Sequence, residues 1–482
     1  MKKSFILWIA MLTTCMASAQ VSTWDGTCEP WTHGTGTEAD PFLIENAQQL
    51  ANLFYRVNNG LDAGGGHVSN HDLHYKLMVD VDLNGSEDFQ WTPIGYWNSD
   101  TDYQCFGGYF DGNNHVITNL YINSEADRVG LFGFVDGATI MQVHIDSGNI
   151  STTSKHAGGI IGASIGTSNI IYCSNNTAVF SNENTGGIIG IISHTTNSTV
   201  RVLNCQNSGN ISSGGSGYCS TGGIIGDNYQ CSNSVVENCL NIGDITSSGS
   251  GNWRYVGGIV ALNHYSHISI TNCYNTGNIT NSGIGYNRYA SGILGANNTY
   301  DAEVKYTYNV GDIVIDGGSG CASGIGCVQS GSINITNSYY LNTCGGNNTY
   351  GGVAMTSTQM RDPQFVTTLN QGQATPVWES DYANPINDGY PILEWQLSGV
   401  GINENGIGDC TISPNPTNGK VIIEAKDLKH VSINNLLGQT MYDGNASGNE
   451  FTYDFSKHKT GIYLICIETT SGVVVKKVSV TR

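Results

Sequence analysis

A repeat of about 34 residues through the middle of the chain constrains its fold more than any other feature. A Gly-[Ile/Leu/Val]-rich tetrapeptide recurs, with copies that begin at Gly130, Gly159, Gly187, Gly223, Gly258, Gly292 and Gly324. In phase with it, a segment that reads Asn-Cys-x-Asn-x-Gly-Asx-Ile recurs with small changes. Its glycines are spaced by a constant 34 residues, at Gly209, Gly243, Gly277 and Gly311. Self-similarity at this period is typical of a solenoid or an array of small units.

The composition of each repeat indicates which solenoid to expect. Each repeat has three short β-prone runs, exemplified by Gly223–Ile225, Ser234–Cys239 and Asp244–Ser247. Glycine and asparagine lie between the runs, where turns need positive φ. No run in the repeats carries a helical period, which argues against helical solenoids. We therefore predict an all-β chain whose repeats form a right-handed parallel β-helix with rungs ~4.8 Å apart. A β-propeller is the alternative, but it would need four antiparallel strands per repeat.

Stacked rungs would bring equivalent side chains into columns. One column is amide-bearing and could form a hydrogen-bonded asparagine ladder: Asn175, Asn207, Asn241, Asn275 and Asn309. A second column is of thiols: Cys173, Cys205, Cys239 and Cys273. Metal or redox chemistry is one interpretation of these cysteines, but they lack the CxxC spacing of zinc sites. We favour a buried structural column, because cysteine often packs as a small hydrophobe.

The first twenty residues have the pattern of a secretory signal peptide. Lys2 and Lys3 precede an apolar run, and Ala17 and Ala19 frame a small-residue cleavage site before Gln20. The alternative, in which Cys15 is lipidated, has no Gly or Ala before the cysteine. No stretch of about 18 apolar residues follows, so no transmembrane helix is expected. The predicted compartment is therefore oxidising.

Charge divides the chain into two parts. The whole sequence has 19 Lys+Arg against 39 Asp+Glu, and its 12% charged residues are about half the usual share. Residues 410–482 have a net charge of +2, whereas the rest of the mature chain has −24. The acidic part lacks the basic footprint of a nucleic-acid binder. The domains that we predict are a signal peptide (1–19), an N-terminal cap with the first rungs (20–128), repeats (129–345), a C-terminal cap (346–397), a linker (398–409) and a separate tail domain (410–482).

The repeats resemble the GLUG motif of bacterial surface proteins. The resemblance rests on the Gly-Gly-Ile-Ile-Gly copies, on Asn272-Cys273-Tyr274-Asn275-Thr276-Gly277, and on the segment from Phe106 to Asn113 with His115 to Leu120. It covers about residues 28–396 and implies a β-helix displayed at a cell surface, often in adhesion. It does not imply one ligand.

The tail resembles the type IX secretion sorting domain, a small Ig-like antiparallel sandwich of Bacteroidetes. The residues that carry this resemblance include Pro414, Asn415, Pro416, Gly438, Gly461, Tyr463, Lys476 and Lys477. Alternating runs separated by Gly/Asn turns agree with a sandwich. The resemblance implies contact with the type IX machinery, passage through the periplasm, and an extracellular or outer-membrane location.

No catalytic constellation stands out. Asp244 and Asp312 share a column two rungs apart, ~9.6 Å, which could suit an inverting glycosidase pair, but Asx in this turn is explained by its conformation. The segment Asp80–Gly85 begins like a calcium loop and then lacks the bidentate Glu. Asp111 and His115 could form an acid–base pair, and we expect structural roles for both. We assign no catalytic residue, no cofactor and no specific metal site, although acidic loops could bind Ca²⁺.

Aromatic side chains give the better functional hypothesis. They flank the Gly-Gly-Ile strand at similar offsets in three repeats and should form two stripes that border one face: Tyr218, Tyr229, Trp253, Tyr255, Tyr265, Tyr286, Tyr289 and Tyr300. Aromatic faces suit sugar rings, and exposed apolar groups mark interaction sites. The structural alternative is that they shield the strands. A strongly negative chain would repel anionic glycans and nucleic acid, so a neutral glycan or a host or bacterial surface protein is the expected partner.

One helical pattern is expected outside the repeats. Residues 355–371 place Met360, Val366 and Leu369 on one face, with Thr358 as N-cap, and we interpret this helix as a cap over the last rung. The sequence thus predicts a secreted, surface-displayed binding protein or adhesin. A β-helix polysaccharide lyase or glycoside hydrolase is the alternative, and a purely structural surface component is the third.

Overall fold

The computed structural model forms two compact units, of which the first ends at Leu393 and the second begins at Glu394. It describes residues 21–61, 68–69, 72–283, 286–316, 319–346, 350–381, 385–399, 411–415, 417–435, 440–459, 461–469 and 472–481. The predicted signal peptide, with Ala17, Ala19 and Gln20, lies outside the described residues. So does the predicted linker, apart from residues 398 and 399, which end helix α4 (Glu394–Gly399).

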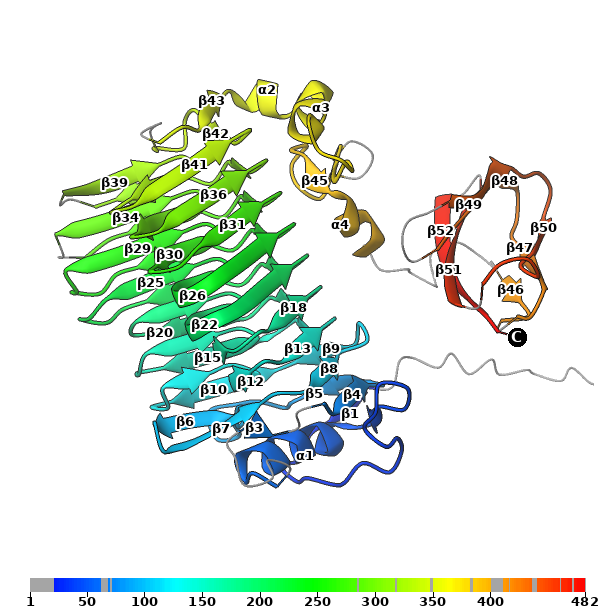
Figure 1. Ribbon diagram of the computed structural model, residues 1–482, viewed down its shortest axis with the longest axis horizontal. Helices are drawn as coiled ribbons and strands as arrows, with labels where there is room; N and C mark the ends of the chain where they lie inside the picture. The colour runs from blue at the N-terminus through cyan, green and yellow to red at the C-terminus, as the bar shows by residue number, and fades with distance from the viewer. Residues whose placement is uncertain are drawn as a thin grey trace, which may run out of the picture. The chain divides into compact units, whose positions relative to one another are not determined.

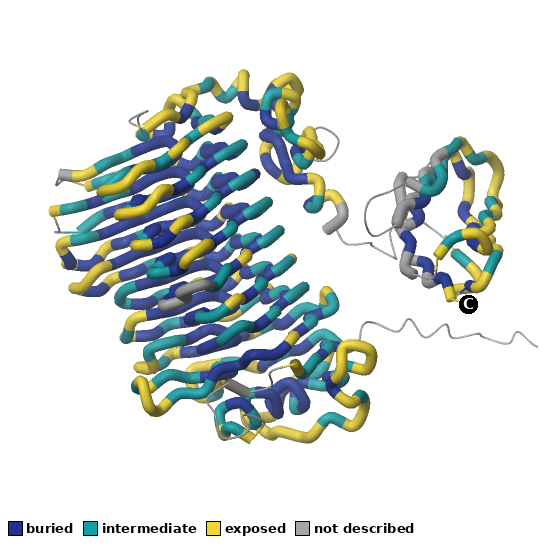
Figure 2. The backbone as a smooth tube through the Cα atoms, in the orientation of Figure 1, coloured by how far each residue is buried: buried dark blue, intermediate teal, exposed yellow. Residues whose placement is uncertain are grey.

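The first unit is a parallel β-solenoid (Figure 1). Within the described residues its strands form sheets of 11, 7, 7 and 18 members. Successive turns pair in parallel register: Ile225 lies opposite Val260, and Ile245 opposite Ile279. Such rung-on-rung pairing excludes a propeller, whose blades are antiparallel. The interior is one continuous hydrophobic core, seen in Figure 2 as buried backbone along the whole stack.

Among the described residues the turns have four or five strands rather than the three predicted, because in some turns one long strand takes the place of two. One turn runs through β25 (Cys219–Gly222), β26 (Ile225–Glu237), β27 (Leu240–Asn241) and β28 (Ile245–Ser247), and β29 (Trp253–Gly257) begins the next. The Gly-Gly-Ile motif that we expected as a strand spans the corner from β25 to β26. A Cβ at Gly223 would lie 2.1 Å from the Gly258 carbonyl oxygen and 2.5 Å from Asn241 Cγ. The motif is therefore glycine because the corner has no room for a side chain.

An amphipathic helix, α1 (Ala47–Asn58), covers the first end of the stack (Figure 1). Its buried face includes Leu50, Leu53 and Val57, and the Asn46 side chain caps it by accepting from the Gln49 backbone N–H (2.8 Å). The sequence analysis missed this helix, because it named residues 355–371 as the one helical pattern. The Asn-x-x-Gln cap followed by apolar spacing of three and four would have indicated it.

The helical segment after the repeats differs from the prediction. It forms two short helices, α2 (Ser357–Met360) and α3 (Pro363–Asn370), separated at Asp362 because a residue before proline disfavours the helical region. The N-cap of α2 is Thr356, not Thr358, in a capping box with Gln359. Met360 and Leu369 are buried as expected, but Phe365 takes the place predicted for Val366.

This segment also packs on the side of the solenoid rather than only over its last rung. After β43 (Val353–Met355), which pairs with β42 (Tyr339–Leu341), the chain turns back along the sheet. Trp378 in β44 (Trp378–Glu379) packs against Tyr274 and Tyr308, two successive turns, with centroid distances of 6.1 and 5.4 Å. The stacked tyrosines offer this flank a broad apolar surface.

The second unit contains a small antiparallel β-structure with its own core. One sheet joins β46 (Thr411–Ser413), β47 (Lys420–Glu424) and β50 (Glu450–Asp454). The other joins β49 (Thr440–Asn445), β48 (Leu428–Asn435), β51 (Gly461–Thr469) and β52 (Gly472–Val480). Alternating residues of both sheets fill the core, such as Val421, Ile423, Ile465 and Ile467. This arrangement confirms the predicted all-β tail.

Candidate functional site

The candidate site is a groove of about 620 Å³ on the outer surface of the solenoid. Its floor comes from β22 (Ile189–Leu203), β26 and β30 (Val260–His264), which contribute Ile191, Asp227 and Leu262. Two aromatic walls rise on either side of this floor. The full lining is Glu183, Asn184, Ile191, Tyr218, Asp227, Tyr229, Trp253, Tyr255, Leu262, His264, Tyr265, Asn298 and Gln329.

The first wall is a stack of rings from successive turns. Trp253 lies nearly parallel to Tyr218 (centroids 6.4 Å apart, planes at 9°) and to Tyr255 (6.4 Å, 18°). Tyr289 continues the stack behind Tyr255, at 5.4 Å and 21°. The in-register pairing of β29 with β34 (Asn287–Ser291) places Tyr255 opposite Tyr289. Parallel strands thus convert a sequence repeat into one continuous aromatic surface.

The second wall comes from Tyr229 within β26, His264 at the end of β30 and Tyr265 directly after it. Tyr229 contacts His264 (5.0 Å) and Tyr265 (6.4 Å), and His264 stacks on Tyr265 (4.5 Å, 25°). Burial lowers the pKa of His264, so its ring is neutral and serves as another flat face at neutral pH. Tyr265 adopts a positive φ of 53° at the turn, and its side chain is 44% exposed.

Five of the eight aromatic residues that the sequence singled out line this groove. Tyr289 backs the first wall, whereas Tyr286 and Tyr300 lie outside the lining. Tyr286 is 73% exposed, and Tyr300 packs on His267 at 5.0 Å. The two predicted stripes are therefore present in the middle turns. The repeat that contains Tyr286, Tyr289 and Tyr300 contributes little to them.

The two acidic residues in the groove lining, Asp227 and Glu183, were missed by sequence analysis. Asp227 is 7% exposed, and its Oδ1 has no hydrogen-bond partner among the described residues. Burial raises the pKa of Asp227 well above its usual value. Burial also raises the pKa of Glu183, and the positive charge of Lys155 partly offsets this rise. Tyr255 donates from its hydroxyl to Gln329 Oε1 at 2.7 Å, which fixes the ring in the wall.

A signal for Asp227 does exist in the sequence. It follows the Gly223–Gly226 motif directly, and the residue at the same place in the neighbouring turns is apolar, Ile191 before it and Leu262 after it. Comparing this position across the repeats would have revealed one carboxyl in an apolar row.

The asparagine column is a continuous buried ladder. Each Nδ2 donates to the Oδ1 of the next turn: Asn175 to Asn207 (2.9 Å), Asn207 to Asn241 (2.7 Å), Asn241 to Asn275 (2.7 Å) and Asn275 to Asn309 (2.7 Å). Each of these five residues is fully buried. A second ladder that we did not expect links Asn228, Asn263 and Asn297 at 2.8 and 2.7 Å.

The cysteine column is buried and its thiols are free. Cys173, Cys205, Cys239 and Cys273 each contact backbone carbonyl oxygens, as Cys239 does with those of Val202 and Glu237 (both 3.3 Å). Burial raises the pKa of Cys173, Cys205 and Cys239 well above the usual value, so these are unreactive thiols. No group of three metal-binding side chains occurs among the residues that the structure describes. The one disulfide within them joins Cys321 and Cys327.

The acidic residues considered for catalysis have structural contacts. Asp244 Oδ1 accepts from the Asn278 backbone N–H (2.9 Å), and Asn278 Oδ1 accepts from that of Asp312 (3.2 Å), so the Asx column ties successive turns together. Asp111 and His115 do not pair with each other. His115 bonds to Asp80 (2.9 Å), and Asp111 pairs with Lys76 (3.3 Å).

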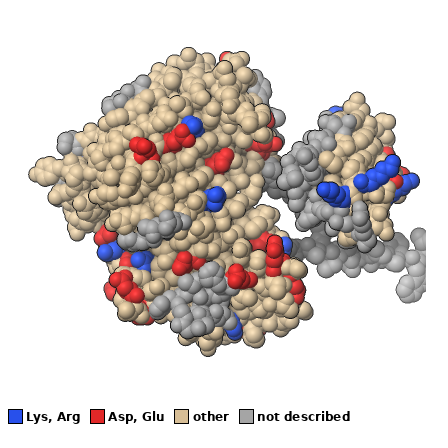
Figure 3. Space-filling model, viewed as in Figure 1, with Lys and Arg blue, Asp and Glu red and all other residues tan. Residues whose placement is uncertain are grey.

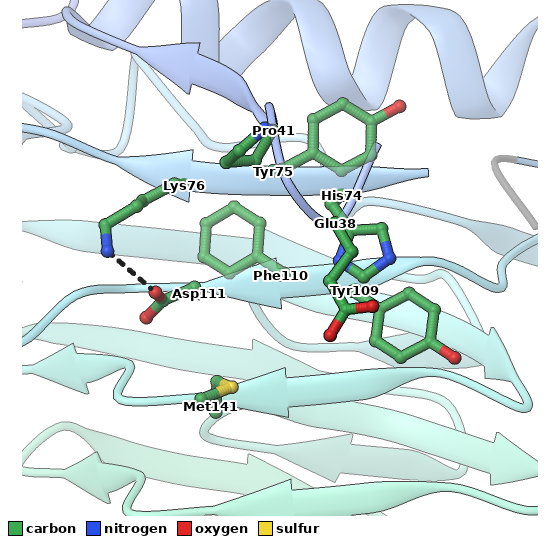
Figure 4. Close-up of a pocket in the computed structure, with 9 residues that line it drawn as sticks. All are labelled: Glu38, Pro41, His74, Tyr75, Lys76, Tyr109, Phe110, Asp111 and Met141. Carbon is green, nitrogen blue, oxygen red and sulfur yellow. Dashed lines mark ion pairs between the residues drawn. The ribbon is translucent and has the colours of Figure 1, made fainter. Parts of the chain in front are cut away.

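Asp111 also lines a second, smaller pocket of about 390 Å³ near the first turns, shown in Figure 4. There the His74 ring stacks flat on Tyr109, at 4.1 Å and 1°. The Lys76–Asp111 ion pair lies on its other side. Because Lys76 and Asp111 already pair with each other, these two residues have less unsatisfied chemistry to offer a ligand than the buried acid of the aromatic groove.

The sorting-signal residues fall on the tail unit. Tyr463 is buried in β51 and donates to the Lys459 carbonyl oxygen (2.9 Å), and Gly461 begins the same strand. Pro414 and Asn415 follow β46, and Lys476 and Lys477 lie in β52. Pro416 and Gly438 lie outside the described residues.

Comparison with known protein families identifies two parts of the chain. Residues 411–481 match the family described as the secretion system C-terminal sorting domain, and residues 254–280 match the GLUG motif. The chain carries a sorting domain. This domain implies secretion by the type IX system, to the cell surface or the extracellular space. None of the helices in the described part of the chain has the length and apolarity that a membrane span requires.

The curated relatives are similar over limited stretches. Halomucin from Haloquadratum walsbyi is 31% identical over 166 residues, which is 33% of this chain and 2% of halomucin. A protein from Evansella cellulosilytica, provisionally named a Gly-rich membrane protein, is 34% identical over 106 residues, or 21% of this chain and 10% of that protein. The chain thus spans a small fraction of either relative.

One solved structure is similar over most of the chain. It is a protein from Bacteroides ovatus that is provisionally named an immunoglobulin A1 protease, with a TM-score of 0.48 and 20% identity. The match covers 76% of this chain and 95% of that chain.

Proposed function

We propose that this protein is a binding protein displayed at the cell surface, and that its aromatic groove holds a neutral glycan. The observation that carries the proposal is the pair of facing aromatic walls, Tyr218–Trp253–Tyr255 and Tyr229–His264–Tyr265, across a floor of two apolar residues and one acid. Flat rings on both sides of a groove suit the apolar faces of sugar rings, while polar groups at the bottom can bond to hydroxyls.

Charge supports a neutral ligand. The residues that line the groove include two acids, Glu183 and Asp227, and neither Lys nor Arg. Charged side chains are also sparse on the face of the solenoid seen in Figure 3. An anionic glycan would therefore lose hydration of its charge in the groove without gaining an ion pair with a lining Lys or Arg, which disfavours its binding. A rigid solenoid that is exported with a sorting domain is well suited to present such a groove outside the cell.

The test is binding of the full chain to an array of neutral and anionic glycans, followed by calorimetry with the best binder. Trp253→Ala should weaken binding by tenfold or more, which is at least about 1.4 kcal/mol. Tyr286→Ala is the matched control, because it removes a more exposed ring outside the groove lining. Equal affinity of both variants and the wild type would contradict the proposal.

A carbohydrate-active enzyme is the second candidate, and one observation favours it. Glu183 and Asp227 line the same groove, and burial raises the pKa of both. Glycoside hydrolysis uses two carboxyl groups, one of them with a raised pKa as the general acid. The same array hits should be incubated with the protein and assayed for new reducing ends or unsaturated products. Their appearance, and their loss in Glu183→Gln, would favour hydrolysis or elimination over simple binding.

A further inference from the structure

The floor of the groove contains one residue that the fold itself does not require. Parallel register aligns one row of outward-facing residues across five turns, Ala163, Ile191, Asp227, Leu262 and Ala296. Four of the five are apolar and all are buried. The packing of this row thus favours an aliphatic side chain at every position, and Asp227 is the exception.

Asp227 is also unpartnered where it lies. It is 93% buried, and its Oδ1 has no hydrogen-bond partner among the described residues. In the same turn, Ser220 is fully buried, and its Oγ also has no hydrogen-bond partner among the described residues. Ser220 lies between Asn184 and Tyr255 in its own column, and both of these line the groove. Two orphan polar groups thus occur in one turn beneath the aromatic walls.

A buried polar group without a partner destabilises a fold, and such groups are retained where function needs them. The surroundings also favour the neutral acid over the carboxylate. The titratable groups among the residues lining the groove are Glu183, Tyr218, Tyr229, Tyr255, His264 and Tyr265, and no cation is among them. Burial raises the pKa of Asp227 well above its usual value, which favours the neutral carboxyl, a group that can both donate and accept a hydrogen bond.

We propose that Asp227 is the specificity-determining residue of the groove, and that its carboxyl exchanges hydrogen bonds with a hydroxyl of a neutral saccharide. A sugar hydroxyl is the ligand group that matches a neutral acid, because it also donates one bond and accepts others. A ligand carboxylate or sulfate would meet the acid without a cation to balance it. This inference rests on the proposed function, since it needs the saccharide to occupy the groove.

Two substitutions separate recognition from folding. Asp227→Leu repeats the residue found at the next turn and should fold at least as stably as the wild type, because it removes an orphan polar group. Asp227→Asn keeps a donor and an acceptor in nearly the same shape. Malto-, cello-, xylo- and manno-oligosaccharides are the probes, measured by calorimetry with the full chain, with Trp253→Ala as the reference for loss of the wall.

We expect Asp227→Leu to weaken binding by tenfold or more without lowering the melting temperature, and Asp227→Asn to bind within about threefold of the wild type. If Asp227→Leu binds as the wild type does while Trp253→Ala does not, the role of Asp227 is refuted and the groove remains the site. If Asp227→Leu melts well below the wild type, the acid is structural and the inference fails. If the wild type binds none of the probes, the inference and the neutral-glycan proposal fail together.

Discussion

The asparagine ladder should make a large and measurable contribution to the stability of the solenoid. Asn241 lies in the middle of it, fully buried. Its Nδ2 donates to the Gly243 carbonyl oxygen (2.8 Å) and to Asn275 Oδ1 (2.7 Å), and its Oδ1 accepts from Asn207 Nδ2 (2.7 Å). Asn241→Ala removes these three hydrogen bonds and leaves buried partners on both neighbouring turns.

The magnitude follows from those contacts. Each lost hydrogen bond costs about 1 kcal/mol net, and each buried group left without a partner raises this toward 1–3 kcal/mol. We therefore expect Asn241→Ala to lower the free energy of unfolding by about 3–6 kcal/mol. The loss should affect the whole unit, because each turn of a solenoid is stabilised by its neighbours.

The assay is denaturant unfolding followed by tryptophan fluorescence. Six of the eight tryptophans lie among the described residues of the first unit and none lies beyond residue 395, so the signal reports chiefly on the solenoid and not on the tail sheets. The control is Asn334→Ala, an exposed asparagine of β41 (Ser332–Thr336), which should change stability by less than about 0.5 kcal/mol. A loss below about 1 kcal/mol for Asn241→Ala would refute the reasoning, because the ladder would then contribute little to the free energy of unfolding.

Two further predictions concern titration and thiol reactivity. His156 is buried, and burial lowers its pKa to about 3. The unfolded chain therefore binds a proton that the folded chain does not, and stability should fall by about 1.4 kcal/mol per pH unit as pH drops from about 6.5 toward 3. His156→Asn should flatten the measured slope, and an unchanged slope would show that another group causes it. Peptide mapping after brief alkylation at pH 8 should label Cys28, which is exposed, and not Cys205 or Cys239 before unfolding. Labelling of Cys239 in the native protein would contradict its burial.

The sequence was sufficient to predict the solenoid, its first asparagine ladder and its cysteine column, because each depends on strict periodicity. Asn241 and Asn275 are 34 residues apart, and in-register parallel strands convert that spacing directly into contact. The corner at Gly223 was misassigned as a strand because glycine there is chosen by two long-range contacts. One is to the Gly258 carbonyl and the other to the Asn241 side chain, and neither is visible in local sequence.

The site was predicted only in part for a related reason. Aromatic residues such as Trp253 and Tyr255 recur at visible offsets, so the walls were expected. The floor residue Asp227 lies at a position whose burial depends on which faces of β25 and β26 meet at the corner. Because the sequence analysis predicted a strand at this corner, the burial of Asp227 could not be inferred from it. Helix α1 was missed because its 12 residues occur once, outside the repeats, so that no second copy of the pattern reinforces its Asn46 cap and apolar face.

The most direct test of the central claim is a crystal structure of the full chain grown with the neutral oligosaccharide that binds it best. We expect a sugar ring stacked on Trp253 between the two aromatic walls, with one hydroxyl within hydrogen-bond distance of the Asp227 carboxyl. A saccharide bound elsewhere on the solenoid, with the groove empty, would contradict the account.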